Sequence, residues 1–312
     1  MKYYIGVDGG GTKTAYALFD ENKKMLANVE GKGSNHENLP GSFDEASDYI
    51  IEGINDLCRK AGVEIKDISF TLMGLAGIDH PYQHDRMCAL LKEKGLGNFE
   101  IFNDGFIVVK AGSETGAAIG YNCGTGVCCN AVDSRGNMLQ LMGLGDFTGD
   151  VSGGVNIAVK AFELVYNELF LNAEKTLITK SVKKEYRIEK REELLALVEK
   201  LENGEAEYIR NFVGFFFEAA KRGDGPALDY CAVMAKRGAQ AISALANQLE
   251  FDGDEIEVVL SGSINVKLDN AVYIDMLKSK AQAYCEKRLK FIKLTAMPVT
   301  GCINWILQEF AN

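Results

Sequence analysis

The sequence has 312 residues, enough for two domains, and its 47% apolar and 25% charged residues are typical of an ordinary globular protein. A formal net charge of −10 argues against nucleic acid as a partner. No apolar run is long enough to span a bilayer, no basic stretch precedes an apolar leader, and the eight cysteines form no C-x-x-C pair. We therefore expect a cytoplasmic protein with reduced thiols and with no membrane or nucleic-acid partner.

The first motif is a strand that ends at an aspartate and continues into three glycines. Apolar residues in 3–7 predict a buried strand, Asp8 follows it, and residues 15–19 predict a second strand after the turn. Glycine permits positive φ and lets backbone N–H groups approach a ligand with no Cβ in the way. An ordinary glycine-rich β-turn is the alternative. The stretch favours a phosphate-binding turn, with Asp8 suited to a hydrated Mg²⁺, made by Gly9, Gly10, Gly11, Thr12 and Lys13.

A polar loop lies between the next predicted elements. Residues 24–29 predict a third strand of an antiparallel meander, and Ser34-Asn35-His36 follow in a loop without apolar periodicity. Asparagine offers both donors and acceptors, which suits sugar hydroxyls, although a solvated connector has the same composition. Residues 43–61 predict a helix, and residues 68–75 predict a buried strand that ends in a glycine turn at Gly77. We expect this turn at the edge of a site.

The next strand ends in Asn103-Asp104. Residues 80–94 predict a helix, residues 99–102 a short strand, and residues 106–112 a second helix. A carboxylate at a strand end, beside a helix N-terminus, can accept a proton from a substrate hydroxyl. Asp104 is therefore a candidate general base. The alternative is that Asp104 only caps the helix that follows it.

The second half of the chain repeats the strand–turn–strand pattern. Residues 117–121 and 127–132 predict strands on either side of Gly124-Thr125-Gly126, which predicts a second phosphate-binding turn. From residue 155 to 248 the apolar residues recur with a helical period. Residues 257–260 then predict a strand that enters the turn Ser261-Gly262-Ser263. The remaining elements are predicted as a helix, a strand and a last helix, at 272–287, 291–294 and 302–310.

Together these motifs resemble the BadF/BadG/BcrA/BcrD ATPase and N-acetylglucosamine kinase branch of the sugar kinase/heat-shock chaperone/actin superfamily. The resemblance covers almost the whole chain, with five motifs in the expected order. It implies an α/β fold of two ribonuclease-H-like (actin-like ATPase) domains with an interdomain cleft. We expect residues 1–112, completed by the C-terminal helix 299–312, to form the first domain. Residues 113–298 would form the second, with a helical insertion.

The resemblance also implies an activity: ATP-dependent phosphotransfer, with Mg²⁺, to the hydroxyl of a small-molecule sugar, most simply an amino sugar such as N-acetylglucosamine, by a homodimer. Asp104 matches the catalytic base and Asp8 the Mg²⁺ ligand. The nucleotide phosphates are assigned to Gly9, Gly10, Gly11, Thr12, Lys13, Gly124, Thr125 and Gly126. Adenosine is assigned to Gly262 and Ser263. The sugar is assigned to Ser34, Asn35, His36, Gly77, Asp104 and Asp150.

The chain also departs from the family's motifs. Val127 replaces the serine of a GTGS motif, and Val151 replaces the glutamate after Asp150. Two alternatives therefore stay open. One is a non-catalytic sugar-binding relative, and the other is an ATPase activator of a radical acyl-CoA dehydratase or reductase. The usual CAAGTG run of such activators is absent, because residues 122–126 have the sequence NCGTG.

Overall fold

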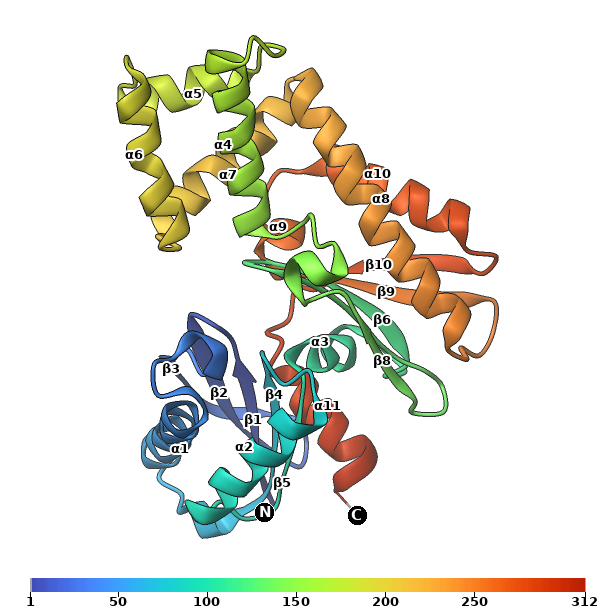
Figure 1. Ribbon diagram of the computed structural model, residues 1–312. Helices are drawn as coiled ribbons and strands as arrows, with labels where there is room; N and C mark the ends of the chain where they lie inside the picture. Colours follow the sequence, from blue (N-terminus) through green and yellow to red (C-terminus); the bar gives the residue numbers. More distant parts are fainter. Residues whose placement is uncertain (1, 312) are drawn as a thin grey trace. The chain divides into compact units, whose positions relative to one another are not determined.

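The computed structural model describes residues 2–311 (Figure 1). The chain divides into two compact units. The first unit contains the chain up to Gly120, Ala131–Gly136, and the chain from Leu294 onward; the second contains Tyr121–Asn130 and Asn137–Lys293. The C-terminal segment thus belongs to the same unit as the N-terminal strands.

The first unit is built on a mixed five-stranded sheet. Its first three strands form an antiparallel meander, and the other two extend the sheet in parallel. The order is β3-β2-β1-β4-β5, for strands β1 (Tyr3–Gly9), β2 (Lys13–Asp20), β3 (Met25–Lys32), β4 (Ile68–Leu75) and β5 (Phe99–Phe102). The parallel strands β1, β4 and β5 end on the same edge of the sheet, which is where ligands bind in α/β sheets.

Helices pack against this sheet, and the hydrophobic core lies between them and the strands. The apolar face of α1 contributes Ile50, Ile54 and Leu57, which are fully buried with the side chains of β1 and β4. The helical elements of the unit are η1 (His36–Asn38), α1 (Ser42–Ala61), η2 (Ile65–Asp67), α2 (Pro81–Glu93), α3 (Asp104–Gly112), α11 (Thr300–Trp305) and the π-helical turn η4 (Ile306–Phe310).

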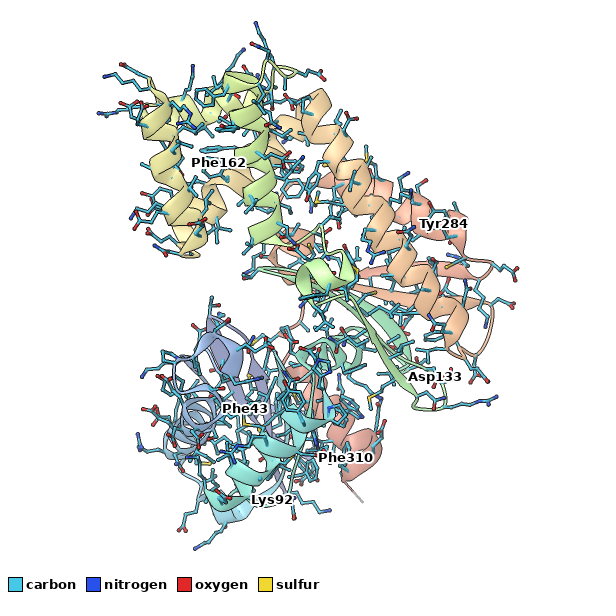
Figure 2. The ribbon with its side chains drawn as sticks, viewed as in Figure 1. Phe43, Lys92, Asp133, Phe162, Tyr284 and Phe310 are labelled. Carbon is cyan, nitrogen blue, oxygen red and sulfur yellow. The ribbon has the colours of Figure 1, made fainter. Side chains whose placement is uncertain are left out.

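The C-terminal segment is packed tightly into the first unit. A Cβ on Gly301 would collide with the carbonyl oxygen of Ile107 on α3. Beyond α11, the ring of Phe310, labelled in Figure 2, stacks on Phe70 of β4 with centroids 5.0 Å apart. The last helix is therefore part of the first unit's core, although nearly 200 residues separate it from α3.

The second five-stranded sheet has the order β10-β9-β6-β7-β8. Its strands are β6 (Ala118–Cys123), β7 (Val127–Val132), β8 (Met138–Leu141), β9 (Glu255–Ser261) and β10 (Arg288–Lys293). Its helical elements are η3 (Gly145–Thr148), α4 (Gly154–Phe170), α5 (Leu177–Tyr186), α6 (Arg191–Glu202), α7 (Ala206–Lys221), α8 (Gly225–Gln248), α9 (Gly262–Lys267) and α10 (Ala271–Tyr284).

Most elements lie where the sequence predicts them. The exceptions are short: β8 and α9 are not predicted, and α3 begins at Asp104, two residues before the predicted start. All eight cysteines are free. Within residues 2–311, no helix combines the length and the apolar character needed to cross a membrane.

Candidate functional site

The first glycine turn joins β1 to β2 and packs against a second loop. None of its three glycines has a positive φ, so a left-handed conformation is not the reason for glycine here. A Cβ on Gly9 would lie 2.6 Å from Ser34 Oγ, and one on Gly11 would lie 2.8 Å from Asn38 Nδ2. Glycine is needed at these two positions because the loop that carries Ser34 and Asn38 packs too closely against the turn to leave room for a Cβ.

The tip of this turn is open to a ligand. Gly10 N–H donates to the carbonyl oxygen of Lys13 at 3.0 Å, which closes the turn, while Gly11, Thr12 and Lys13 are exposed. Lys13 Nζ lies 2.5 Å from the carboxylate of Glu30. Lys13 must therefore leave this exposed ion pair to reach a phosphate.

The loop at residues 34–36 is held from both sides. Ser34 is buried, and its Oγ accepts a hydrogen bond from Thr14 Oγ1 at 2.9 Å. Asn35 Oδ1 accepts from Glu37 N–H at 2.9 Å, and the His36 ring stacks on Phe43 with centroids 3.8 Å apart. Burial lowers the pKa of His36, so its imidazole is neutral at pH 7.

Gly77 brings the turn after β4 against the same loop. Its φ is +80°, and a Cβ there would collide with Asn35 Oδ1 and lie 3.2 Å from His36 Cε1. Here a positive φ and a close approach both require glycine. The structure thus brings together the four predicted sugar-binding residues of this region: Ser34, Asn35, His36 and Gly77.

Three carboxyl groups gather at the carboxyl ends of β1, β4 and β5. Burial, and next the charges of Asp8 and Asp79, raise the pKa of Asp104 to about 7. Burial also raises the pKa of Asp8 to about 6, against the opposing charge of Lys13. Such perturbed carboxyl groups at a sheet edge are typical of functional sites. Asp79 was not singled out from the sequence, because no local pattern connects it to Asp104.

Asn103, and not Asp104, caps helix α3. The Oδ1 atom of Asn103 accepts from Gly105 N–H at 2.9 Å, while Asp104 is the first helical residue. The N-cap residue is therefore Asn103, although the Asp104 carboxyl group also accepts from the backbone N–H of Gly105. Asn103 Nδ2 donates to Asp79 Oδ1 at 3.0 Å, so the capping side chain also contacts the third carboxylate of the group.

The second glycine turn, Gly124–Gly126, lies in the second unit against the first residues of α4. Gly154 N–H donates to the carbonyl oxygen of Gly124 at 2.8 Å, and Val155 N–H donates to that of Thr125 at 3.2 Å. Gly153 has a φ of +95°, and a Cβ on Gly153 would collide with the backbone of Gly126. By contrast, a Cβ on Gly126 itself would meet nothing within 4 Å.

The turn after β9 lies beside this second glycine turn. Gly262 has a φ of +85°, and a Cβ there would collide with the backbone of Cys123 at the end of β6. The nitrogen of Ser263 lies 3.8 Å from where a Cβ of Gly124 would be. The structure therefore brings together the predicted phosphate-binding turn and the predicted adenosine-binding residues Gly262 and Ser263.

Asp150 is engaged within its own loop. Its Oδ2 accepts from Gly143 N–H at 2.9 Å and from Gly145 N–H at 3.0 Å, and its Oδ1 accepts from Thr148 Oγ1 at 3.1 Å. The side chain is buried. Its evident role is to fix the shape of this loop, and a sugar hydroxyl would have to share an oxygen atom that is already hydrogen-bonded.

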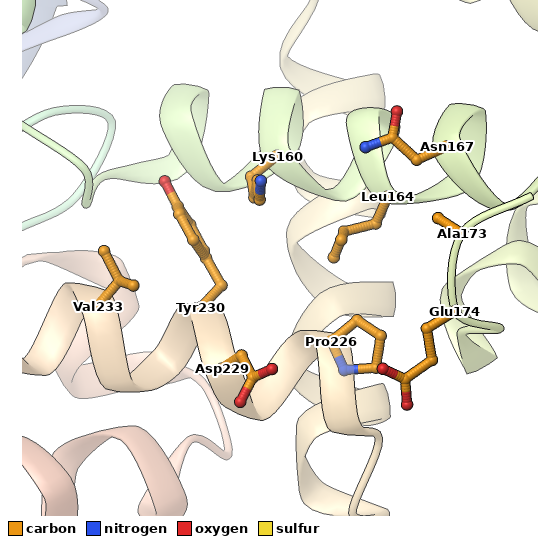
Figure 3. A pocket seen from close by; sticks show the side chains of 9 residues that line it. All are labelled: Lys160, Leu164, Asn167, Ala173, Glu174, Pro226, Asp229, Tyr230 and Val233. Carbon is orange, nitrogen blue, oxygen red and sulfur yellow. The ribbon is translucent and has the colours of Figure 1, made fainter. Parts of the chain in front are cut away.

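A pocket of about 320 Å³ lies elsewhere in the second unit, between α4 and α8 (Figure 3). Lys160 and Tyr230 face each other across it, with Nζ 5.5 Å from the ring centroid. None of the predicted site residues lines this pocket.

Asp8 is the residue that the sequence predicts to hold Mg²⁺. Among the described residues, no group of three or more His, Cys, Asp or Glu side chains could hold a metal. Mg²⁺ is commonly bound by one or two carboxylates together with waters and substrate phosphates. Asp8, partly exposed beside the glycine turn, fits that pattern.

Comparison with known proteins decides the family. Residues 5–289 match the model of the BadF/BadG/BcrA/BcrD ATPase family. The chain belongs to this family. Two proteins are similar to this chain in sequence: an N-acetylmuramic acid/N-acetylglucosamine kinase of Clostridium acetobutylicum and an N-acetyl-D-glucosamine kinase of Dictyostelium discoideum.

The first relative is 27% identical over 196 residues, which are 62% of this chain and 63% of that kinase. The match therefore spans less than two thirds of the Clostridium kinase. The second is 26% identical over 233 residues, which are 71% of this chain and 72% of that kinase.

Solved structures of the same fold cover almost the whole chain. A candidate N-acetylglucosamine kinase from Chromobacterium violaceum has a TM-score of 0.69 at 20% identity and covers 99% of both chains. A ROK family glucokinase from Streptomyces griseus, solved with glucose and AMPPNP, has a TM-score of 0.59 at 16% identity and covers 97% of both. The family and the two-domain actin-like fold expected from the sequence are confirmed.

Proposed function

We propose that this family member transfers the γ-phosphoryl group of ATP to a hydroxyl of an amino sugar such as N-acetylglucosamine. The observation that carries the proposal is Asp104, a carboxyl group at the sheet edge whose pKa is raised to about 7. A general base is most effective when its pKa lies near the working pH. The named sugar kinases among the relatives support the same reaction class.

Each proposed site residue has a defined task. Asp104 accepts the proton of the sugar hydroxyl as the hydroxyl oxygen attacks the γ-phosphorus and ADP leaves. Asp8 would hold a Mg²⁺ ion, which would supply charge neutralisation at the phosphates. Backbone N–H groups of the turns Gly9–Lys13 and Gly124–Gly126 hold phosphate oxygens. Such catalysis consists mainly of positioning and charge stabilisation. Gly262 and Ser263 contact the adenosine.

The acceptor is assigned to the loop at 34–36 with Gly77. Because Asn35 Oδ1 is committed to Glu37 N–H, its Nδ2 is the group that we assign to a sugar oxygen. Asp150 shapes its own loop and is the least available of the proposed sugar ligands. Val127 and Val151, which replace polar residues of the family pattern, make the choice of sugar an experimental question.

We further propose that the enzyme works in the cytoplasm as a homodimer. Eight free cysteines suit a reducing compartment. Val233 on α8, which lines the pocket of Figure 3, and Val159 on α4 are each about half exposed, and a second copy would cover such apolar side chains. Sedimentation equilibrium tests the dimer, and a monomer at micromolar concentration would contradict it.

The deciding experiment is coupled ADP release with Mg²⁺ and a panel of glucosamine, N-acetylglucosamine, N-acetylmuramic acid, N-acetylmannosamine and glucose. We expect ADP release that requires both Mg²⁺ and an amino sugar. Sugar binding without ADP release would favour the non-catalytic relative. Bound iron and a brown colour would favour the activator of a radical dehydratase or reductase.

A further inference from the structure

Asp79 is one of the three carboxylates that gather at the sheet edge, and its negative charge is unfavourable there. It follows the turn at Gly77, and its negative charge raises the pKa of Asp104. A like charge near a catalytic carboxylate destabilises the ionised base, so a residue with no other role would be better replaced by a neutral one. The hydrogen bonds of Asp79 indicate what offsets this cost.

The backbone at Asp79 is fixed before its side chain acts. Gln83, a buried residue in the first turn of α2, accepts through Oε1 from the N–H groups of Asp79 and His80, both at 2.8 Å. The carboxylate then accepts from Asn103 Nδ2 at 3.0 Å. Asp79 is thus a preorganised acceptor for a side-chain amide that is itself buried.

The amide of Asn103 links Asp79 to the start of α3. An asparagine side chain has one acceptor end and one donor end. With Nδ2 held by Asp79, the Oδ1 end must point to Gly105 N–H, which it meets at 2.9 Å. Residues 103 and 105 flank Asp104, so this link fixes the backbone on both sides of the candidate base.

We infer that Asp79 is a positioning residue for the phosphotransfer reaction: through Asn103 it holds the first turn of α3 so that Asp104 presents its carboxylate to the acceptor hydroxyl. The inference rests on the proposed function. It assigns to Asp79 no contact with the sugar or the nucleotide, and it requires an acceptor oxygen at position 79 rather than a negative charge.

Three variants, assayed at pH 8 where Asp104 is ionised, test this role. Asp79→Ala removes the acceptor, Asp79→Asn keeps an acceptor oxygen without the charge, and Asn103→Ser keeps a capping oxygen but loses the amide donor. We expect kcat to fall by about 10- to 100-fold in Asp79→Ala and in Asn103→Ser, the usual effect of losing an outer-shell partner. KM for ATP and sugar should stay unchanged, and Asp79→Asn should retain most of kcat.

The double variant Asp79→Ala/Asn103→Ser should be no slower than either single variant, because both remove the same link. Glu93→Ala, at an exposed position on α2, is the matched control and should behave like wild type. Equal losses in Asp79→Asn and Asp79→Ala, additive losses in the double variant, or a raised KM with normal kcat would each overturn the inference.

A readout without catalysis separates this inference from the proposed function. In NMR spectra, the side-chain NH₂ of Asn103 should exchange slowly with water in wild type and Asp79→Asn, and faster in Asp79→Ala. Unchanged exchange in Asp79→Ala overturns the link whatever the activity. If the wild type phosphorylates no sugar, the proposed function fails, while the exchange measurement still decides whether Asp79 holds Asn103.

Discussion

At the residue scale, the raised pKa of Asp104 favours general-base catalysis but destabilises the folded protein at neutral pH. Its folded-state pKa of about 7 lies above the ordinary value of 3.8. Between roughly pH 4 and pH 7 the folded state therefore binds more protons than the unfolded state. The contribution of Asp104 to the free energy of unfolding must then fall as the pH rises across this range. The same shift brings the carboxyl group into the range where a general base works at neutral pH.

Replacing Asp104 with asparagine should remove the base and keep the shape of the site. We expect kcat to fall by about 10² to 10⁴-fold, the usual contribution of a general base, with ATP and sugar affinities retained. In wild type, kcat/KM should rise with pH until Asp104 is ionised, at or below about pH 7 because bound Mg²⁺ stabilises nearby carboxylates. Coupled ADP release and calorimetry measure these quantities.

The matched control is Asp275→Asn, which removes an exposed carboxylate on α10. It should leave the rate and its pH dependence unchanged. A wild-type kcat in Asp104→Asn would show that the base is another group.

Asp104→Asn should also stabilise the ligand-free protein at pH 8. It removes a negative charge that burial and two neighbouring carboxylates disfavour. Since one pKa unit corresponds to about 1.4 kcal/mol, the gain is at most about 4 kcal/mol, and water at the partly exposed carboxylate reduces it further. Urea unfolding at pH 8 and pH 4 measures the gain, which should vanish at the lower pH. A loss of stability at pH 8 would contradict the unfavourable charge.

At the element scale, the two glycine turns differ in why they contain glycine. Gly9 and Gly11 are crowded by the side chains of Ser34 and Asn38, so substitution there disturbs the fold itself. Gly126 has open space around it and no positive φ, so the fold of the unit does not require glycine at that position. A substitution at Gly126 therefore separates ligand binding from folding.

We expect Gly126→Ala to keep the wild-type melting temperature and to weaken ATP binding by at least about tenfold, because a Cβ would block phosphate oxygens from the backbone N–H groups. Gly124→Val should act in the same direction. Calorimetric titration with AMPPNP and thermal unfolding measure the two effects. Gly97→Ala, at an exposed loop position with no positive φ and open space around a Cβ, controls for the loss of a glycine. Unchanged nucleotide affinity in Gly126→Ala and Gly124→Val would remove the turn from the nucleotide site.

The sequence predicts the elements and turns better than the contacts between them. Apolar runs that end in glycine identify β1, β4 and β6, because a buried strand and its turn are local features. The crowding of Gly9 by Ser34 depends on a loop 25 residues away, and the cap at Asn103 depends on which of two polar neighbours reaches Gly105. Asp79 could not be recognised, since its role depends on a hydrogen bond to a different strand end.

At the scale of the whole molecule, a single tryptophan distinguishes the two units. Trp305 is the only tryptophan of the chain, and it is buried in the first unit. Its ring stacks on Phe102, with centroids 4.0 Å apart, directly before Asn103 and Asp104. Tryptophan fluorescence therefore reports the first unit at the end of the strand that carries the candidate base. Far-UV circular dichroism is dominated by helices α4–α10 of the second unit.

These two signals test where the sugar binds. A ligand that binds only the folded state, at about 100 times its Kd, stabilises the unit that binds it by about 2.7 kcal/mol. We propose that Asn35 and Asp104 of the first unit contact the sugar, so the accepted amino sugar should raise the fluorescence-detected unfolding midpoint more than the midpoint detected by circular dichroism. A panel sugar that does not bind by calorimetry serves as the control and should move neither midpoint. A shift confined to circular dichroism would mean that the second unit holds the sugar and that the assignments of Asn35 and Asp104 are wrong.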